Sequence, residues 1–155
     1  MPELLVVDDD PLIAGMLRMV LESEGYEVSH AEDGRAALQV LADDPPACMV
    51  LDMMMPHVDG YGVLEALQQR IGATTRVVML TCCSAEEDVR KALTLGADDY
   101  LTKPVDVDHL LNTVRDLLSL ELDAVEARRH EVEDEGEMVR RIDGVLGRHA
   151  QFLAG

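Results

Sequence analysis

The stretch from Leu4 to Pro11, LLVVDDDP, decides the fold of this chain because it places four aliphatic residues directly before three aspartates and a proline. Such an aliphatic run is typical of a strand that is buried on both faces, as in a parallel sheet. Asp10 followed by Pro11 is typical of a helix start, since Asp caps free N–H groups and Pro fits the first helical position. The stretch therefore predicts a buried strand that leads through an acidic loop into a helix.

The same alternation of strand and helix patterns continues along the chain. Apolar residues with helical spacing follow each of the capping residues Asp10, Asp33, Asp59, Ser84 and Asp106. Short apolar runs predict strands at residues 4–7, 48–51 and 76–80, and a weaker pattern at 27–31 and a short one at 99–102 predict two more. Five strands that alternate with five helices predict an α/β fold, a doubly wound five-stranded parallel sheet with right-handed crossovers.

The polarity of the strands predicts their order in the sheet. The strand at 27–31 carries several polar side chains and is expected at an edge, whereas those at 4–7, 48–51 and 76–80 are apolar on both faces and are expected at the centre. Numbered along the chain, the expected order is 2-1-3-4-5. The switch point then lies between strands 1 and 3, where such sheets bind ligands beyond the carboxyl ends of the strands.

The composition narrows the possible partners. The formal net charge is −18, with 13 basic and 31 acidic residues, so the chain is expected to repel nucleic acid and anionic lipid surfaces. Three cysteines without a CxxC spacing argue against a disulfide framework or a zinc site. The start has no signal-peptide pattern, and no stretch reaches the ~18 apolar residues of a membrane span. We expect a cytoplasmic protein.

Acidic residues follow two strands that are predicted neighbours. Asp8 and Asp9 end the first strand, and Asp52 ends the third. Polar loops and helix caps also contain aspartates, and that explanation suffices for Asp10 and Asp59. Two further carboxylates beside a cap only add repulsion, so we expect Asp8, Asp9 and Asp52 to converge on a shared site.

The residue types at these strand ends suit phosphoryl chemistry. Three neighbouring carboxylates do not all stay ionised without a positive partner, and Mg²⁺ with several waters suits a site with few protein ligands. Thr81 ends the fourth strand and Lys103 follows the fifth, which adds a hydroxyl donor and a positive charge. Cation, ammonium and hydroxyl together hold a phosphoryl group during transfer. A carboxylate such as Asp52 can itself accept that group as an acyl phosphate.

Four motifs resemble one known family. LLVVDDDP at 4–11, MVLDMMMPHVDG at 49–60, VVMLT at 77–81 and ADDYLTKP at 97–104 together resemble the receiver domain of two-component response regulators, of the chemotaxis type. The resemblance covers about residues 3–120 in order. It implies a flavodoxin-like fold and a signalling receiver rather than an enzyme, with a receiver domain at 1–120 and a helical tail or signalling linker at 121–155.

The resemblance also assigns roles to individual residues. Asp52 would accept a phosphoryl group from a sensor histidine kinase or a phosphotransfer protein. Mg²⁺ would be bound by Asp9, Asp52 and the backbone carbonyl of Met54, with Asp8 acting largely through water. Thr81 and Lys103 would contact the phosphoryl oxygens, and the Lys103–Pro104 bond would be cis. Thr81 and Tyr100 would act as the switch that remodels the face formed by the fourth helix, fifth strand and fifth helix.

Two positions depart from the pattern expected near such a site. In receivers, the residues two after the phosphoacceptor and two after the threonine are often polar and orient the attacking water. Here they are Met54 and Cys83. Neither side chain orients water well, so we expect slow autodephosphorylation.

The C-terminal segment carries one apolar column of a heptad. Its members recur every seventh residue: Leu111, Leu118, Val125, Val132, Val139, Leu146 and Leu153. A stable coiled coil needs a second apolar column, and the second column here is largely polar. Two interpretations remain: a solvated amphipathic helical extension, or a signalling helix that dimerises or feeds an output module. A homodimer would use this helix or the face of the fourth helix, fifth strand and fifth helix.

An enzyme is the alternative interpretation. Phosphatases of the haloacid dehalogenase type also use an aspartate nucleophile, Mg²⁺, a threonine and a lysine, and the Asp8-x-Asp10 spacing is similar to their first motif. In that case Asp8 would be the nucleophile. Leu12 stands where such enzymes usually have Thr or Val, and Asp52 would have no role.

Overall fold

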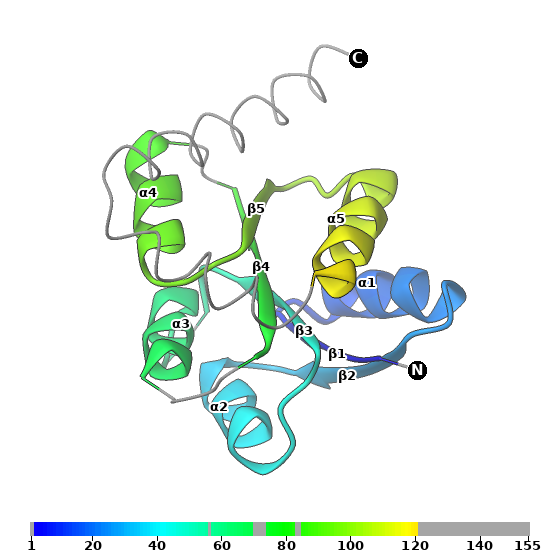
Figure 1. Ribbon diagram of the computed structural model, residues 1–155, viewed down its shortest axis with the longest axis horizontal. Helices are drawn as coiled ribbons and strands as arrows, with labels where there is room; N and C mark the ends of the chain where they lie inside the picture. Colours follow the sequence, from blue (N-terminus) through cyan, green and yellow to red (C-terminus); the bar gives the residue numbers. More distant parts are fainter. Residues whose placement is uncertain (1, 56, 70–73, 83–84, 121–155) are drawn as a thin grey trace.

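Five parallel strands alternate with five helices in the part of the chain that the computed structural model describes, residues 2–55, 57–69, 74–82 and 85–120 (Figure 1). The elements are β1 (Glu3–Val7), α1 (Pro11–Ser23), β2 (Glu27–Ala31), α2 (Gly34–Asp43), β3 (Cys48–Asp52), α3 (Gly60–Gln68), β4 (Arg76–Thr81), α4 (Glu86–Thr94), β5 (Asp99–Thr102) and α5 (Val107–Ser119). This order confirms the predicted alternation.

The strands pair in the order β2-β1-β3-β4-β5, and every pair is parallel. The predicted flavodoxin-like topology is therefore confirmed. Because all strands run in one direction, their carboxyl ends lie at one edge of the sheet. The register places Val7 beside Leu51 and Asp52 beside Leu80, so the residues after β1 and at the end of β3 meet at that edge.

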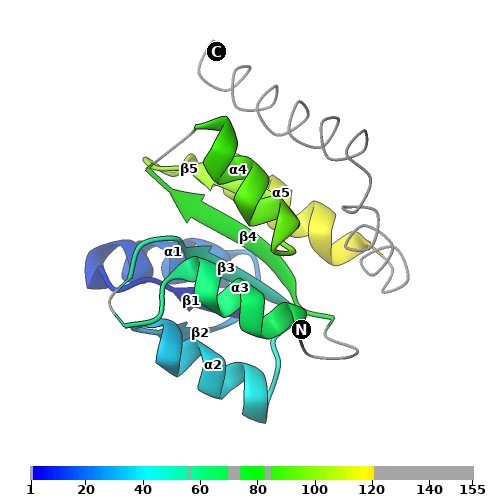
Figure 2. The same cartoon turned by 90° about the vertical axis from the view of Figure 1, so that its left-hand side faces the viewer.

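Helices cover both faces of the sheet (Figure 2). The helices α2, α3 and α4 contribute buried residues to the core on one face, together with Leu5 and Val7 of β1. The helices α1 and α5 pack on the other face against Leu4 and Val6. Successive side chains of a strand point to opposite faces, so the aliphatic run of β1 supplies both cores. β2, with three exposed residues, is an edge strand as predicted.

Aspartates begin four of the five helices, as predicted. Asp10, Asp33, Asp59 and Asp106 are the N-cap residues, and each side chain accepts a hydrogen bond from a backbone N–H group of the first turn. These contacts satisfy donors that the helix itself leaves free. The acidic loop after β1 and the loop after β3 therefore lead directly into well-defined helices.

The start of α4 differs from the prediction. Ser84 was expected to cap this helix, but the N-cap residue is Ala85, which offers no capping side chain, and Ser84 lies outside the described residues. The first turn carries Glu86, Glu87 and Asp88. Their negative charges interact favourably with the positive end of the helix dipole. Charge thus substitutes for the side-chain cap.

In α1, only part of the apolar pattern is buried. The buried stripe consists of Ala14, Leu17 and Leu21, whereas Leu12 and Met16 are exposed. The apolar residues of α1 form a wider band than one stripe, and the sheet covers only the part that faces it. Helical spacing alone therefore predicted the helix but not its buried face.

The described part of the chain ends at Leu120, directly after α5. The predicted helical tail, its heptad column beyond Leu118 and a dimer contact through it fall on residues 121–155, outside the described residues, and stay predictions. Among the described helices, none has the length and apolar character needed to cross a membrane.

Arg76 joins the start of β4 to the end of α5, and its loss should destabilise the fold. Its side chain is largely buried, and Nη2 donates to the Leu120 carbonyl oxygen over 2.6 Å. Arg76→Met keeps the apolar stem but leaves that carbonyl without its charged donor, so we expect the free energy of unfolding to fall by about 1–3 kcal/mol. Urea unfolding measures this loss.

Arg90→Met is the matched control for that measurement. Arg90 forms an exposed ion pair with Glu86 one helical turn away, and such pairs contribute about 0.5 kcal/mol or less. Equal unfolding midpoints for the two variants would show that the buried contact of Arg76 does not stabilise the end of α5.

Candidate functional site

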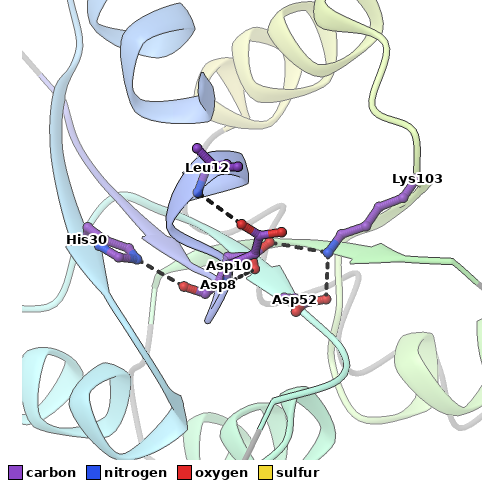
Figure 3. A network of polar contacts seen from close by, with 6 residues as sticks. All are labelled: Asp8, Asp10, Leu12, His30, Asp52 and Lys103. Carbon is purple, nitrogen blue, oxygen red and sulfur yellow. Dashed lines mark hydrogen bonds and ion pairs between the residues drawn. The ribbon is translucent and has the colours of Figure 1, made fainter. Parts of the chain in front are cut away.

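Three strand ends bring Asp8, Asp52 and Lys103 together at the carboxyl edge of the sheet (Figure 3). Asp8 follows β1, Asp52 is the last residue of β3, and Lys103 follows β5. β1 and β3 are neighbours whose register sets Val7 beside Leu51. The next residue along each strand is therefore a carboxylate that faces the other, at the predicted switch point.

The three predicted carboxylates form one cluster. Asp8 and Asp52 are buried, with 1% and 6% of their surfaces exposed, and Asp9 is exposed. One carboxylate oxygen from each lies within 4.8 Å of the others. Oxygen ligands at this separation fit a hard divalent cation, because Mg²⁺ binds through a few carboxylates and completes its shell with water. The exposed side of Asp9 leaves room for that water.

Lys103 supplies the positive charge of the cluster. Its Nζ donates to Asp8 Oδ2 and to Asp52 Oδ1, each over 3.2 Å, and its side chain is 22% exposed. The Lys103–Pro104 peptide bond is cis, as predicted. A single ammonium group therefore bridges the two buried carboxylates, and its positive charge offsets the repulsion between them.

The electrostatics leave Asp52 with too little positive charge around it. Burial raises its pKa, the charge of Asp8 raises it further, and Lys103 and the backbone N–H of Met54 only partly offset this. For Lys103, burial lowers the pKa, but Asp52 and Asp8 outweigh burial and the net shift is upward. The raised pKa values of Asp52 and Lys103 both show an excess of negative charge at the site. A further cation beside Asp52 would therefore be favourable.

Asp10 belongs to the helix and not to the cluster. Its carboxylate accepts from the Leu12 N–H over 2.9 Å, while its own N–H donates to Asp8 Oδ1 over 2.9 Å. Asp59 likewise caps α3 through the Gly62 N–H. The interpretation of these two aspartates as caps is confirmed. The Asp10 N–H also fixes the direction of the Asp8 carboxylate.

The loop after β3 is held against the sheet. The Met53 N–H donates to the Leu80 carbonyl over 3.0 Å, and the Gly60 N–H donates to the Met53 carbonyl over 2.9 Å. A Cβ at Gly60 would lie 2.6 Å from the carbonyl oxygen of Asp52. Only glycine lets α3 begin this close to Asp52. The sequence argument missed this role, and its only signal was a glycine directly after a helix cap.

Thr81 and Tyr100 occupy buried positions near the site. Thr81 ends β4, is 1% exposed and pairs with Thr102 of β5. The Lys103 N–H donates to the Thr81 carbonyl over 2.7 Å, which ties Lys103 to β4. Tyr100 is 2% exposed and belongs to the core under α4. Thr81 lies at the carboxyl end of β4 as predicted, whereas Tyr100 lies two residues before the end of β5, beside Met79. The roles of both in switching stay predictions.

A hollow opens beside the cluster. It has a volume of about 540 Å³ and is lined by Asp9, Met53, Met54, Met55, Asp59 and Tyr61. Met54 is 65% exposed, so its side chain stands at this opening and not in the core. The carboxylate cluster is therefore accessible from solvent through a hollow that is lined mainly by methionine side chains.

Comparison with known proteins identifies the family of this chain. The family model described as the response regulator receiver domain matches residues 4–115, which include every member of the cluster. The chain belongs to this family. It is a signalling module rather than an enzyme. The phosphatase alternative is thereby set aside, because the chain belongs to the receiver family.

The curated relatives of this chain include proteins named as transcriptional regulators. The DNA-binding dual master transcriptional regulator RpaA of Synechocystis sp. is 40% identical over 119 residues, 76% of this chain and 49% of the relative. The transcriptional regulatory protein CpxR of Escherichia coli is 42% identical over 118 residues, 76% of this chain and 50% of the relative. The chain thus spans about half the length of these relatives.

Solved structures agree with the receiver assignment. The signal receiver domain of a signal transduction histidine kinase from Syntrophus aciditrophicus has a TM-score of 0.72 and 37% identity, covering 77% of this chain and 91% of that one. The chemotaxis protein CheY4 of Vibrio cholerae has a TM-score of 0.71 and 30% identity, covering 76% and 98%.

Proposed function

We propose that this receiver domain is a phosphorylation-controlled switch whose phosphoacceptor is Asp52. A sensor histidine kinase or a phosphotransfer protein would supply the phosphoryl group in a Mg²⁺-dependent reaction. The observation that carries the proposal is the convergence of Asp8, Asp9 and Lys103 on one buried carboxylate. Such convergence stabilises the charge that a phosphoryl group brings to its acceptor.

The proposed transfer is a simple substitution at phosphorus. An Asp52 carboxylate oxygen attacks the phosphorus, an acyl phosphate forms, and the P–N bond to the donor histidine breaks, with its electron pair returning to the imidazole. Lys103, already within 3.2 Å of Asp52 Oδ1, would move onto a phosphoryl oxygen. The Thr81 hydroxyl would donate to another phosphoryl oxygen.

The carboxylate cluster is the proposed magnesium site. Asp9 and Asp52 would bind Mg²⁺ directly, the backbone carbonyl of Met54 would add a third protein ligand, and Asp8 would act largely through water. Bound there, Mg²⁺ supplies the positive charge that the raised pKa of Asp52 indicates is missing. The hard oxygen donors and their mutual distances support magnesium over a soft metal.

The proposed output is a change in the face formed by α4, β5 and α5. Thr81 would be drawn toward the phosphoryl group, and Tyr100, which belongs to the same buried core as Val89 and Leu93 of α4, would stabilise the rearranged face. A homodimer that forms through this face or through residues 121–155 would transmit the phosphorylation state of Asp52. Both relatives are named as transcriptional regulators, but the charge of −18 argues against direct DNA contact by this chain.

Phosphorylation of the full chain with a small phosphodonor tests the proposal. The chain is incubated with acetyl phosphate, with Mg²⁺ or with EDTA, and the label is located by peptide mass spectrometry. We expect one label, on Asp52, that depends on Mg²⁺. A label on Asp8, as the phosphatase alternative required, or a label that forms equally well in EDTA, contradicts the proposal.

The exposed Met54 side chain leads to a prediction about signal lifetime. We expect the acyl phosphate to persist for minutes or longer, because Met54 offers no hydrogen bond to an attacking water. Met54→Asn should shorten the half-life about tenfold, less than the ~10²-fold that a well-positioned general base contributes, because an amide only orients the water. Loss of label from the phosphorylated protein measures both half-lives.

Met19→Asn is the control for this prediction. Met19 is 73% exposed, as Met54 is at 65%, but it lies on α1 and does not line the hollow beside the cluster. Its replacement should leave the half-life unchanged. Loss of phosphate from the wild-type protein within seconds would show that another group already orients the water.

A further inference from the structure

His30 brings a side chain from the edge strand β2 to the carboxylate cluster. Its Nε2 lies 3.0 Å from the backbone carbonyl oxygen of Asp8 (Figure 3). A carbonyl oxygen only accepts hydrogen bonds, so Nε2 must carry the proton and donate. His30 has no part in the phosphoacceptor chemistry described above, although it contacts the backbone of Asp8, a member of the carboxylate cluster.

The register of the sheet explains why a side chain is needed at this point. β1 and β2 pair from Glu3 and Glu27 up to Val7 and Ala31, and the Asp8 N–H makes the last backbone contact, to the Ala31 carbonyl over 3.3 Å. β2 ends there, and Asp33 already caps α2. The backbone of β2 therefore turns away just where the Asp8 carbonyl needs a donor, and the imidazole provides it.

Holding this carbonyl fixes a peptide plane. The Asp8 carbonyl and the N–H and Cα of Asp9 belong to one planar unit, so an anchor on the oxygen also orients Asp9. The Asp8 carboxylate has its own anchors, the Asp10 N–H and Lys103 Nζ. Asp9 is exposed, and its direction depends on the backbone that carries it.

We propose that His30 is a positioning residue for the cation site. Its Nε2–H sets the Asp8–Asp9 peptide so that the Asp9 carboxylate faces Asp52. This inference rests on the proposed function, because it assumes that the cluster binds Mg²⁺. Groups that orient metal ligands from outside the ligand shell commonly change metal affinity by about 10- to 100-fold when they are lost.

Three variants separate positioning from a general effect on the fold. His30→Leu removes the donor and keeps a side chain of moderate size, whereas His30→Gln keeps an N–H donor. Ser29→Leu is the matched control, because Ser29 is the exposed neighbour on β2 and its side chain points to the opposite face of the sheet. Both positions are exposed on the edge strand, so the variants are expected to fold.

Direct titration of the unphosphorylated chain with Mg²⁺ by calorimetry is the main measurement. We expect His30→Leu to weaken binding by about tenfold, the lower end of the range for such groups, with most of the affinity restored in His30→Gln and no change in Ser29→Leu. Hydrogen exchange of the metal-free protein gives a second readout. The Asp10 N–H should exchange faster in His30→Leu, because the peptide before it is no longer held.

Two outcomes overturn the inference while leaving the proposed function intact. One is an unchanged Mg²⁺ affinity in His30→Leu. The other is a loss in His30→Leu that His30→Gln does not restore, because bulk or β2 stability would then be responsible. If the wild-type chain itself binds no Mg²⁺ and takes no label from acetyl phosphate, the proposed function fails and the role of His30 fails with it.

Discussion

The substitution Asp52→Asn is expected to reduce labelling by acetyl phosphate to background and, in the same protein, to raise the free energy of unfolding at neutral pH. The first effect follows from removal of the acceptor oxygen. The second follows from the site's electrostatics, since burial and the charge of Asp8 raise the pKa of Asp52 in the folded protein. The asparagine side chain has a similar shape and carries no charge to bury.

The sign of the stability effect follows from proton linkage. A carboxylate with a raised pKa binds its proton more tightly in the folded than in the unfolded state. Its contribution to stability is fully present below the usual pKa of an aspartate, about 4, and is lost as the pH rises through the raised pKa of the folded protein. The amide of the Asp52→Asn variant does not titrate and has no such loss, so the advantage of the variant should grow over this window and then level off.

Urea unfolding in EDTA at a series of pH values measures the effect without bound metal. Asp9→Asn is the matched control, because it removes a carboxylate from the same cluster but leaves the acceptor in place. That variant should still be labelled when Mg²⁺ is raised. An Asp52→Asn protein that is less stable than the wild type at neutral pH would show that the ion pair with Lys103 outweighs the cost of burial.

The fold was predictable because one strong pattern carried it. The aliphatic runs of β1, β3 and β4 could belong only to strands covered on both faces, and parallel crossovers then left few arrangements. The predicted strand limits were short by one residue at functional positions, because β3 includes Asp52 and β4 includes Thr81. A polar residue at a strand end has the same pattern as a loop residue. Only the pairing of Asp52 with Leu80 shows that the ladder reaches it.

The main members of the site were predictable for a related reason. Once the strand order is known, residues at neighbouring carboxyl ends must lie together, and this brought Asp8, Asp9, Asp52 and Lys103 into one cluster. The cis peptide before Pro104 was expected from the resemblance to receivers, and Pro104 permits it because cis bonds are confined almost entirely to X–Pro. Topology thus converts residues far apart in sequence into a site without any information on side-chain packing.

Contacts that depend on exact register could not be predicted in this way. His30 looked like an ordinary polar residue of an edge strand, and its contact with the Asp8 carbonyl exists only because β2 ends at Ala31. Gly60 looked like the first residue of a helix, and its lack of a Cβ matters only because the Asp52 carbonyl lies against it. The role of each residue depends on a contact with a backbone carbonyl oxygen from another part of the chain. The sequence pattern around the residue does not indicate that contact.

Lys103→Met should separate two quantities that a general loss of structure would change together. Met keeps the apolar stem but removes the ammonium that bridges Asp8 and Asp52. The rate of phosphorylation by acetyl phosphate at saturating Mg²⁺ should fall about 10²-fold, the usual cost of removing one group that stabilises developing charge. The Mg²⁺ affinity of the unphosphorylated protein should rise, because the cation no longer competes with Lys103 for the carboxylates.

The same substitution should destabilise the metal-free protein. Lys103 lowers the pKa of Asp52, so its loss raises that pKa further and leaves two buried carboxylates without their shared partner. Each charged hydrogen bond contributes roughly 1–3 kcal/mol, and we expect a loss of that order in EDTA that Mg²⁺ reverses. Urea unfolding with and without Mg²⁺ measures both effects.

Lys91→Met is the control, because Lys91 is the other lysine of the chain and its ammonium lies over the Tyr61 ring of α3 instead of bridging Asp8 and Asp52. It should change neither the Mg²⁺ affinity nor the phosphorylation rate. The two variants should change the Mg²⁺ affinity in opposite directions. Lys103→Met should raise it, because a competitor of the cation is removed, and His30→Leu should lower it, because a ligand is misaligned. If Lys103→Met weakens Mg²⁺ binding instead, the ammonium organises the carboxylates for the cation and does not compete with it.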